Sequence, residues 1–195
     1  MVASNQAAGR DCILDQAQQL FFAHGYHGVS IRDIVQACGL SNAALYYHFG
    51  SKQNLYVDVI KGFVASVVRP VQEAEAGSGS SRERLTRMIL AFAEYISESR
   101  SELHMVLRDL TECEGEDIQQ LIPEVTGQVL APFAGVLEDG IAAGEIRAVD
   151  MHLVSFLLMG MLNSLAARRM HGIVATPLTE DVDLAISTLF EGIGT

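Results

Sequence analysis

The side chains best suited to contact a polyanion lie close together, in the run NAALYYHF at residues 42–49. Leu45 and Phe49 are one helical turn apart, so a helix over this run turns both of them inward. Ala43 and Tyr47 then face outward, next to Tyr46. Tyrosine, asparagine and histidine can bond phosphates and base edges, and alanine lets a helix approach a groove floor closely. The run predicts a DNA-reading helix; the alternative is that these side chains pack against a later helix.

Two short helices joined by a tight turn are expected to position this surface. Ser30 can cap the first helix, and Asp33, three residues later, completes a capping box. Apolar residues then recur on one face of that helix: Ile31, Ile34, Val35 and Cys38. Gly39 ends the helix, Leu40 fills the corner and Ser41 caps the next helix. This order of elements predicts a helix-turn-helix.

The run LSNAALYYHFGSKQNL, preceded by GYHGVSIRDIVQACG, resembles the DNA-binding region of the TetR family of bacterial transcriptional regulators. The similarity covers about the first sixty residues, and beyond Lys61 the chain resembles the family only in length and helical character. The resemblance implies an almost entirely helical homodimer. Its N-terminal domain would bind DNA, and its variable C-terminal domain would bind a small molecule and dimerise.

The same resemblance places four side chains on the family's usual DNA-contacting positions: Tyr46, Tyr47, His48 and Lys52. Most of these are phosphate contacts, with Tyr47 nearest the bases. The full set expected to contact double-stranded DNA is Ser30, Arg32, Ser41, Asn42, Ala43, Tyr46, Tyr47, His48 and Lys52. The pair Ala43 and Ala44 departs from the family, whose members often carry a polar residue there. We therefore expect base discrimination to depend on few side chains, on thymine methyl contacts and on DNA shape.

The net charge of −11 is unevenly distributed along the 195-residue chain. Residues 1–70 hold five Lys or Arg against four Asp or Glu, whereas residues 71–195 hold eight against twenty. An acidic body repels DNA at long range, but within a Debye length of about 8 Å the charge of the nearest surface patch determines whether DNA is attracted. We therefore predict a DNA-binding domain at residues 1–55, an effector-binding and dimerisation domain at residues 56–195, and docking by the tip of the molecule.

Helical periodicity extends over nearly the whole chain, which predicts an all-α fold. A first helix is indicated by the apolar stripe Ile13, Leu14, Ala17, Leu20 and Phe21 and ends near His24, after a loose arm at residues 1–9. Lys52 opens a longer helix that continues past Pro70, and the run AGSGSS at residues 76–81 is a flexible break. Further helices are expected at about residues 82–97, 101–113, 118–143, 150–171 and 179–192, with Pro123 and Pro132 limiting the regularity of the third.

The last two predicted helices are apolar on more sides than a monomer's core requires. Gly160 would let a second backbone approach closely. The residues expected at a dimer interface are Leu153, Leu157, Gly160, Met161, Ser164, Ile186, Leu189 and Phe190. The alternative is a central helix enclosed by its own chain. The apolar stretch at residues 153–167 is interrupted by polar residues and is too short for a membrane span, so we expect a buried helix and no membrane partner.

Neither catalysis nor cofactor binding is expected. The sequence has no phosphate-binding glycine loop, no nucleophile elbow and no H-E-x-x-H pair, so it predicts a protein that is not an enzyme. The spacing of His104, Glu112, Cys113 and Glu114 matches no common metal-ligand pattern, and the acidic run from Glu112 to Asp117 favours a solvated loop. Cys12, Cys38 and Cys113 form no disulfide framework, which suits a reducing cytoplasm.

A small-molecule effector is expected in the C-terminal domain, between about residues 82 and 170. The side chains that could line a mainly apolar pocket are Phe92, Tyr95, His104, Met105, Arg108 and Met159. An aromatic and methionine stripe of this kind is also typical of plain core. Arg108 could reach a ligand carboxylate, or pair with Asp109 or Glu112 at the surface.

These patterns together predict a ligand-responsive repressor that binds a palindromic operator as a homodimer. Two other functions fit the sequence. One is a helix-turn-helix regulator without a small-molecule effector, controlled by a protein partner, which a sealed or absent cavity would favour. The other is a helical enzyme with a vestigial DNA-reading module, which convergent polar groups in a deep pocket would favour.

Overall fold

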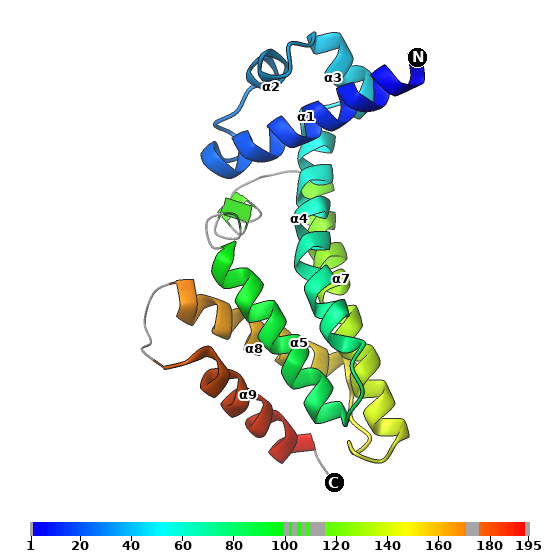
Figure 1. The fold of residues 1–195 in the computed structure, drawn as a ribbon, viewed down its shortest axis with the longest axis vertical. Coiled ribbons are helices and arrows are strands. Elements are labelled where there is room, and N and C mark those ends of the chain that lie inside the picture. The colour runs from blue at the N-terminus through cyan, green and yellow to red at the C-terminus, as the bar shows by residue number, and fades with distance from the viewer. Residues whose placement is uncertain are drawn as a thin grey trace. The chain divides into compact units, whose positions relative to one another are not determined.

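The computed structural model of the chain describes residues 2–99, 102, 105, 106, 108, 109, 116–170 and 176–193. Side chains are described for all of these except 2–6, 116–119, 169, 170 and 193. The helices, shown in Figure 1, are α1 Val2–His24, α2 Ile31–Ala37, α3 Asn42–Phe49, α4 Lys52–Glu75, α5 Ser81–Glu98, α7 Glu116–Ala142, α8 Met151–Met170 and α9 Leu178–Ile193. The all-α prediction is confirmed for this part of the chain.

Two of the predicted elements differ from the structure. The loose arm expected at residues 1–9 is wrong, because α1 is helical from Val2 onward. Most residues of this segment are good helix formers, and Gly9 lies against α3 and the turn before it, where a Cβ would be 3.7 Å from His48 Nε2 and 3.9 Å from Leu40 Cδ1. The helix expected from residue 118 begins at Glu116 and runs through both prolines. The predicted segment 101–113 lies mostly outside the described residues, although its described members are helical.

The chain forms two compact units. The first unit consists of Met1–Phe63 and Ser101–Val125, and the second of Val64–Arg100 and Thr126–Thr195. Helices α4 and α7 therefore each contribute residues to both units. This division differs from the boundary predicted after Leu55, and the packing of the first unit gives the reason.

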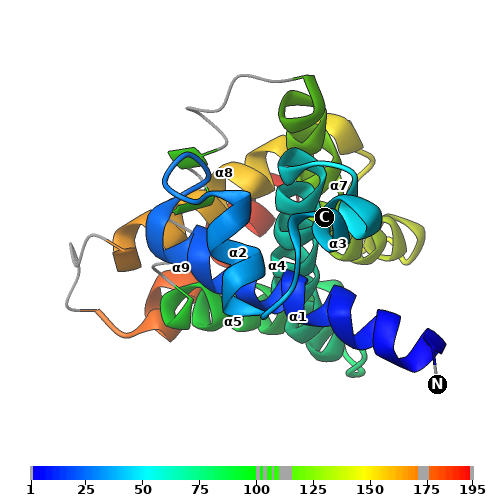
Figure 2. The ribbon, with the colours of Figure 1, turned by 90° about the horizontal axis from the view of Figure 1, so that it is seen from above.

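In the first unit, each of α1, α2 and α3 contacts the other two (Figure 1, Figure 2). The core includes Ile13, Ala17, Phe21, Ile34, Val35, Leu45 and Phe49, all buried. The first turns of α4 complete this core with the buried residues Leu55, Tyr56, Val59 and Ile60. The Tyr56 ring meets the Phe21 ring edge-on, with centroids 5.1 Å apart. A boundary after Leu55 would split this core, because α4 buries its next two turns in it.

Two free cysteines, Cys12 of α1 and Cys38 at the end of α2, lie together in the first unit. Burial, together with the neighbouring Cys12 thiol, raises the pKa of Cys38 to about 12. Because the thiolate is the reactive form of cysteine, Cys38 is a poor nucleophile at neutral pH. It is a packing residue of the helix-turn-helix.

In the second unit, α5 packs against both α8 and α9 (Figure 1). Its buried stripe is Leu85, Met88, Ile89, Phe92, Ala93 and Ile96. A capping box starts the helix: Ser80 Oγ accepts from the Glu83 backbone N–H, and Glu83 accepts from the Ser80 N–H at 2.9 Å. Residues 76–80 form the loop before it, so the predicted break between helices is confirmed, although Ser81 of the predicted run belongs to α5.

Helix α8 is long and apolar enough over Met151–Arg168 to cross a membrane by length and composition, but such a window is also typical of core helices in soluble proteins. Only 28% of this window is buried. One side packs inward through Val154, Leu158, Leu162 and Leu165, whereas Leu153, Phe156 and Leu157 are more than half exposed. The alternative in which this helix is enclosed by its own chain is therefore wrong, and the expected burial is found on one side only.

Candidate DNA-binding site

The candidate reading surface is the outer side of α3. Ser41 caps the helix by accepting from the Ala44 backbone N–H at 3.3 Å, and Gly50, with φ of +74°, ends it. Leu45 and Phe49 are buried, while Tyr46 and Tyr47 are 52% and 73% exposed. The predicted inward and outward faces are confirmed. The alternative, in which the tyrosines pack against a later helix, is wrong.

The preceding helix is fixed by the predicted capping box. Ser30 Oγ donates to Asp33 Oδ2 at 2.6 Å and accepts from the Asp33 backbone N–H at 3.2 Å. The hydrogen bonds from the Ser30 hydroxyl and backbone N–H hold the pKa of Asp33 below its usual value of 3.8. Two predicted DNA contacts, Ser30 and Ser41, thus act as helix caps in this structure. Arg32, Asn42 and Ala43 are exposed.

His48 and Lys52 are more enclosed than the tyrosines. The His48 ring lies edge-on to Tyr47, with centroids 5.1 Å apart, and is half-buried against Gly9 of α1. Lys52 Nζ donates to the Tyr26 carbonyl at 2.6 Å and lies 4.2 Å from the centroid of the Tyr26 ring. An ammonium group has three N–H donors, so Lys52 can serve more than one acceptor.

Arg10 is a positioning residue that the sequence analysis missed. Its guanidinium bonds Asp58 of α4 at 2.8 Å and lies 4.9 Å from the ring centroid of Phe49, the last residue of α3. It therefore links three helices at the end of the reading helix. The arginine and its carboxylate partner are 48 residues apart, and no local pattern connects two positions at that separation.

Comparison with known proteins agrees with this geometry. Residues 13–59 match the family model described as "Bacterial regulatory proteins, tetR family", and residues 78–167 match "Tetracyclin repressor-like, C-terminal domain". Together the two models match more than half of the chain, including the whole helix-turn-helix. The chain belongs to the TetR family of transcriptional regulators.

Relatives with known roles include both repressors and activators of transcription. The chain is 26% identical to the transcriptional repressor KstR2 of Rhodococcus jostii over 77% of this chain and 74% of that protein. It is also 26% identical to the transcriptional activator FasR of Mycolicibacterium smegmatis, over 75% of this chain and 67% of that protein. The crystal structure of FadR from Bacillus subtilis in complex with stearoyl-CoA shares the fold, with a TM-score of 0.75 at 21% identity over 93% of this chain and 97% of that one.

The residues predicted to bind an effector are divided between the two units of this TetR-family chain. Phe92 is buried in the second unit, where Tyr95 Oη bonds Ser66 Oγ at 2.6 Å and Met159 is half-buried. Met105 and Arg108 belong to the first unit, and Arg108 bonds Asp109 at 3.3 Å. The predicted pairing with Asp109 is found, but its location at the surface is wrong, because Asp109 is 2% exposed. His104 lies outside the described residues, as do Glu112 and Cys113. No cluster of three or more potential metal ligands occurs among the described residues.

The predicted dimer residues divide between surface and core. Leu153, Leu157, Gly160 and Ser164 are exposed on α8, and Met161 and Phe190 are half-exposed. Ile186 and Leu189 are buried inside the second unit. Their place on the outer side of α9 is taken by Leu184, which is 70% exposed, and Thr188. Two grooves of about 520 and 560 Å³ run along this side, lined in part by Leu157 and Met161.

Proposed function

We propose that this TetR-family regulator is a repressor that binds a palindromic double-stranded operator as a homodimer and is released by a small, mainly apolar effector. The observation that carries the DNA-binding part is the pair of exposed tyrosines on a capped, eight-residue α3. A helix this short fits within the width of a major groove. Two-fold symmetry then requires two half-sites on one side of the duplex, separated by about one helical turn or more.

The proposed homodimer rests on the exposed apolar residues of the second unit. We define the α8–α9 apolar face as Leu153, Phe156, Leu157 and Leu184, each more than half exposed. Soluble monomers rarely expose large side chains in such a contiguous group, and a second copy of the same face would cover it. An obligate interface of this type buries more than about 2,000 Å² in total. We also propose a cytoplasmic location and no catalytic activity, in keeping with the regulators to which the chain is similar.

The effector proposal is supported by the buried aromatic and methionine residues of the second unit and by the FadR structure, which contains stearoyl-CoA. We propose a long-chain fatty acyl-CoA as the first effector class to test. Effector binding would alter the separation of the two DNA-binding units, so that they no longer match successive grooves. A coupling of about 1 to 3 kcal/mol is sufficient.

Selection from a random double-stranded DNA library tests the operator proposal. Inverted repeats are expected among the recovered sequences, and direct repeats or no enrichment would contradict it. Stearoyl-CoA affinity is then measured with and without the selected operator, because linkage requires DNA to weaken effector binding by the same factor as effector weakens DNA binding. Equal affinities, or no binding of any acyl-CoA, would favour the alternative of a regulator controlled by a protein partner.

A further inference from the structure

A buried carboxylate in the first unit comes from far along the chain. Asp109 is 2% exposed. Its Oδ2 accepts hydrogen bonds from the Tyr26 backbone N–H at 2.7 Å and from the Tyr56 hydroxyl at 3.0 Å. Burial of a carboxylate is costly unless such bonds compensate for lost water. The carboxylate therefore holds together the turn after α1 and the second turn of α4.

Tyr26 connects this carboxylate to a predicted phosphate-binding group. Its backbone N–H bonds Asp109, and its carbonyl accepts from Lys52 Nζ at 2.6 Å. The Tyr26 ring also lies 4.2 Å from the Lys52 ammonium, at a distance that allows a cation–π interaction. Tyr26 therefore contacts both Asp109 and Lys52, so a shift of Tyr26 moves one acceptor of the Lys52 ammonium.

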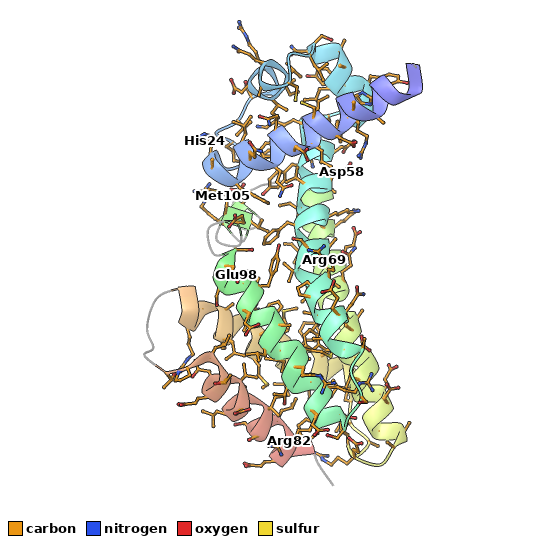
Figure 3. All side chains as sticks on the ribbon, in the orientation of Figure 1. His24, Asp58, Arg69, Arg82, Glu98 and Met105 are labelled. Carbon is orange, nitrogen blue, oxygen red and sulfur yellow. The ribbon has the colours of Figure 1, made fainter. Side chains whose placement is uncertain are left out.

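The turn that holds Tyr26 is packed closely against the residues around Asp109. Gly25 has a φ of +73°, and a Cβ at this position would lie 3.2 Å from Asp109 Oδ1 and 3.3 Å from Met105 Sδ. Figure 3 shows Met105 near His24, the last residue of α1. We call the described residues Glu102, Met105, Val106, Arg108 and Asp109 the 102–109 segment. Val106 is also buried.

We propose that Asp109 is a positioning residue for DNA binding, which acts through Tyr26 to hold the Lys52 ammonium where it contacts a DNA phosphate. The 102–109 segment is then a part of the DNA-binding unit, although it lies about fifty residues beyond the helix-turn-helix in sequence. This inference rests on the proposed function, since it requires Lys52 to contact phosphate. It identifies the residue through which a shift of this segment would reach the DNA contacts.

The test measures affinity for a short duplex of arbitrary sequence over a range of salt concentrations, because a lysine–phosphate contact is independent of base sequence. Each phosphate contact contributes about 0.9 to the slope of log K against log salt. Lys52→Ala should lower the slope by about one unit. Asp109→Asn should lower it by a similar amount and weaken binding about 10-fold at low salt. The double variant should bind no more weakly than Lys52→Ala alone.

The matched control is Asp139→Asn, which removes the same charge from a surface pair with Arg84 in the second unit. Loss of a negative charge by itself strengthens DNA binding through long-range electrostatics. Asp139→Asn should therefore leave affinity equal or slightly higher, while Asp109→Asn lowers it. Tyr56→Phe removes one donor to the carboxylate and retains the ring. It should produce a change of about 2-fold to 3-fold in the same direction, and provides the test if Asp109→Asn does not fold.

The outcomes test the Lys52–phosphate contact and the positioning role of Asp109 separately. If Lys52→Ala leaves the salt slope unchanged, Lys52 does not contact phosphate, and both the predicted contact and the role of Asp109 are wrong. If Lys52→Ala lowers the slope and Asp109→Asn does not, the DNA surface stands and the positioning role is wrong. A loss of stability alone lowers the active fraction, measured by stoichiometric titration, without changing the slope.

Discussion

Two outward surfaces of this protein are similarly exposed and differ in chemistry. Tyr47 on α3 is 73% exposed, and Leu184 on α9 is 70% exposed. The α3 surface combines aromatic rings with hydroxyl groups and is flanked by Asn42 and His48. The α8–α9 apolar face presents aliphatic and phenylalanine side chains. The groups of the first surface can replace hydrogen bonds to water with hydrogen bonds to phosphates and base edges. The second surface gains favourable free energy only when another apolar surface buries it.

The two surfaces also differ in how the chain holds them. The α3 surface lies on eight residues, which are too few for a helix that is stable by itself. It depends on the Ser41 cap, the buried pair Leu45 and Phe49, and the contacts of α1 and α2. The α8 side of the apolar face lies on a 20-residue helix whose opposite stripe fills the core. Exposure alone therefore does not identify a function; the chemistry of the exposed groups separates a nucleic-acid surface from a protein interface.

Leu157→Glu should produce the largest effect, because it places a charge in the α8–α9 apolar face. We expect monomers or aggregates by light scattering and at least a 100-fold loss of affinity for a two-half-site operator, since linked half-sites give about 10²-fold or more. Gln128→Glu introduces the same charge at an exposed position of α7 and should remain dimeric. A dimeric, fully active Leu157→Glu protein would show that this face is not the interface.

Leu45→Ala tests the inward side of α3. The side chain is fully buried, so its truncation should lower the free energy of unfolding by about 2 to 5 kcal/mol. Denaturant titration measures this change, and Gln36→Ala, at an exposed position of α2, should remain within about 0.5 kcal/mol of the parent. A loss below about 1 kcal/mol would mean that α3 is not held by this contact.

Tyr47→Ala tests the outward side of the same helix. We expect stability to change by less than about 0.5 kcal/mol and discrimination between operator variants to fall by about 1 to 3 kcal/mol. Tyr47→Phe retains the ring and separates hydroxyl bonding from apolar contact with bases. Competition binding with variant operators is the measurement. An equal loss of affinity for every sequence would show that Tyr47 contacts phosphate instead of bases.

The capping boxes of the two units should produce the smallest, pH-dependent effects. Hydrogen bonds from Ser30 and from Ser80 hold the pKa values of Asp33 and Glu83 below their usual 3.8 and 4.5. A lowered pKa contributes stability that is complete above the usual value and is lost as pH falls through the lowered value. Asp33→Asn and Glu83→Gln should therefore lower Tm near neutral pH and approach the parent in acid. A difference in Tm that stays constant with pH would contradict this.

Much of the first unit follows from local sequence patterns. Ser30 with Asp33, Gly39, Ser41 and Gly50 determine where α2 and α3 begin and end, because caps and positive φ values depend on a few adjacent residues. The inward and outward sides of α3 follow in the same way from the spacing of Leu45 and Phe49. The TetR resemblance was likewise carried by contiguous residues, and the family comparison confirms it.

Local patterns do not predict which residues far apart in the sequence come into contact. Ile186 and Leu189 form an apolar stripe that looks suited to an interface, yet both are buried against their own chain. Composition groups the predicted effector residues together, whereas the structure divides them between two units. A helical stripe shows that a face is apolar and does not show which neighbour covers it.

The sequence by itself indicated most of the helices, the caps of α2 and α3, the inward and outward sides of α3 and the family, because each depends on neighbouring residues or on one contiguous motif. Only the tertiary structure decided that Arg10 braces the end of α3, that α4 completes the first core, and that Asp109 bonds Tyr26 and Tyr56. The hydrogen bonds of Arg10 and Asp109 join residues 48 to 83 positions apart. Their energies arise from burial and hydrogen-bond geometry, which exist only after the chain has folded.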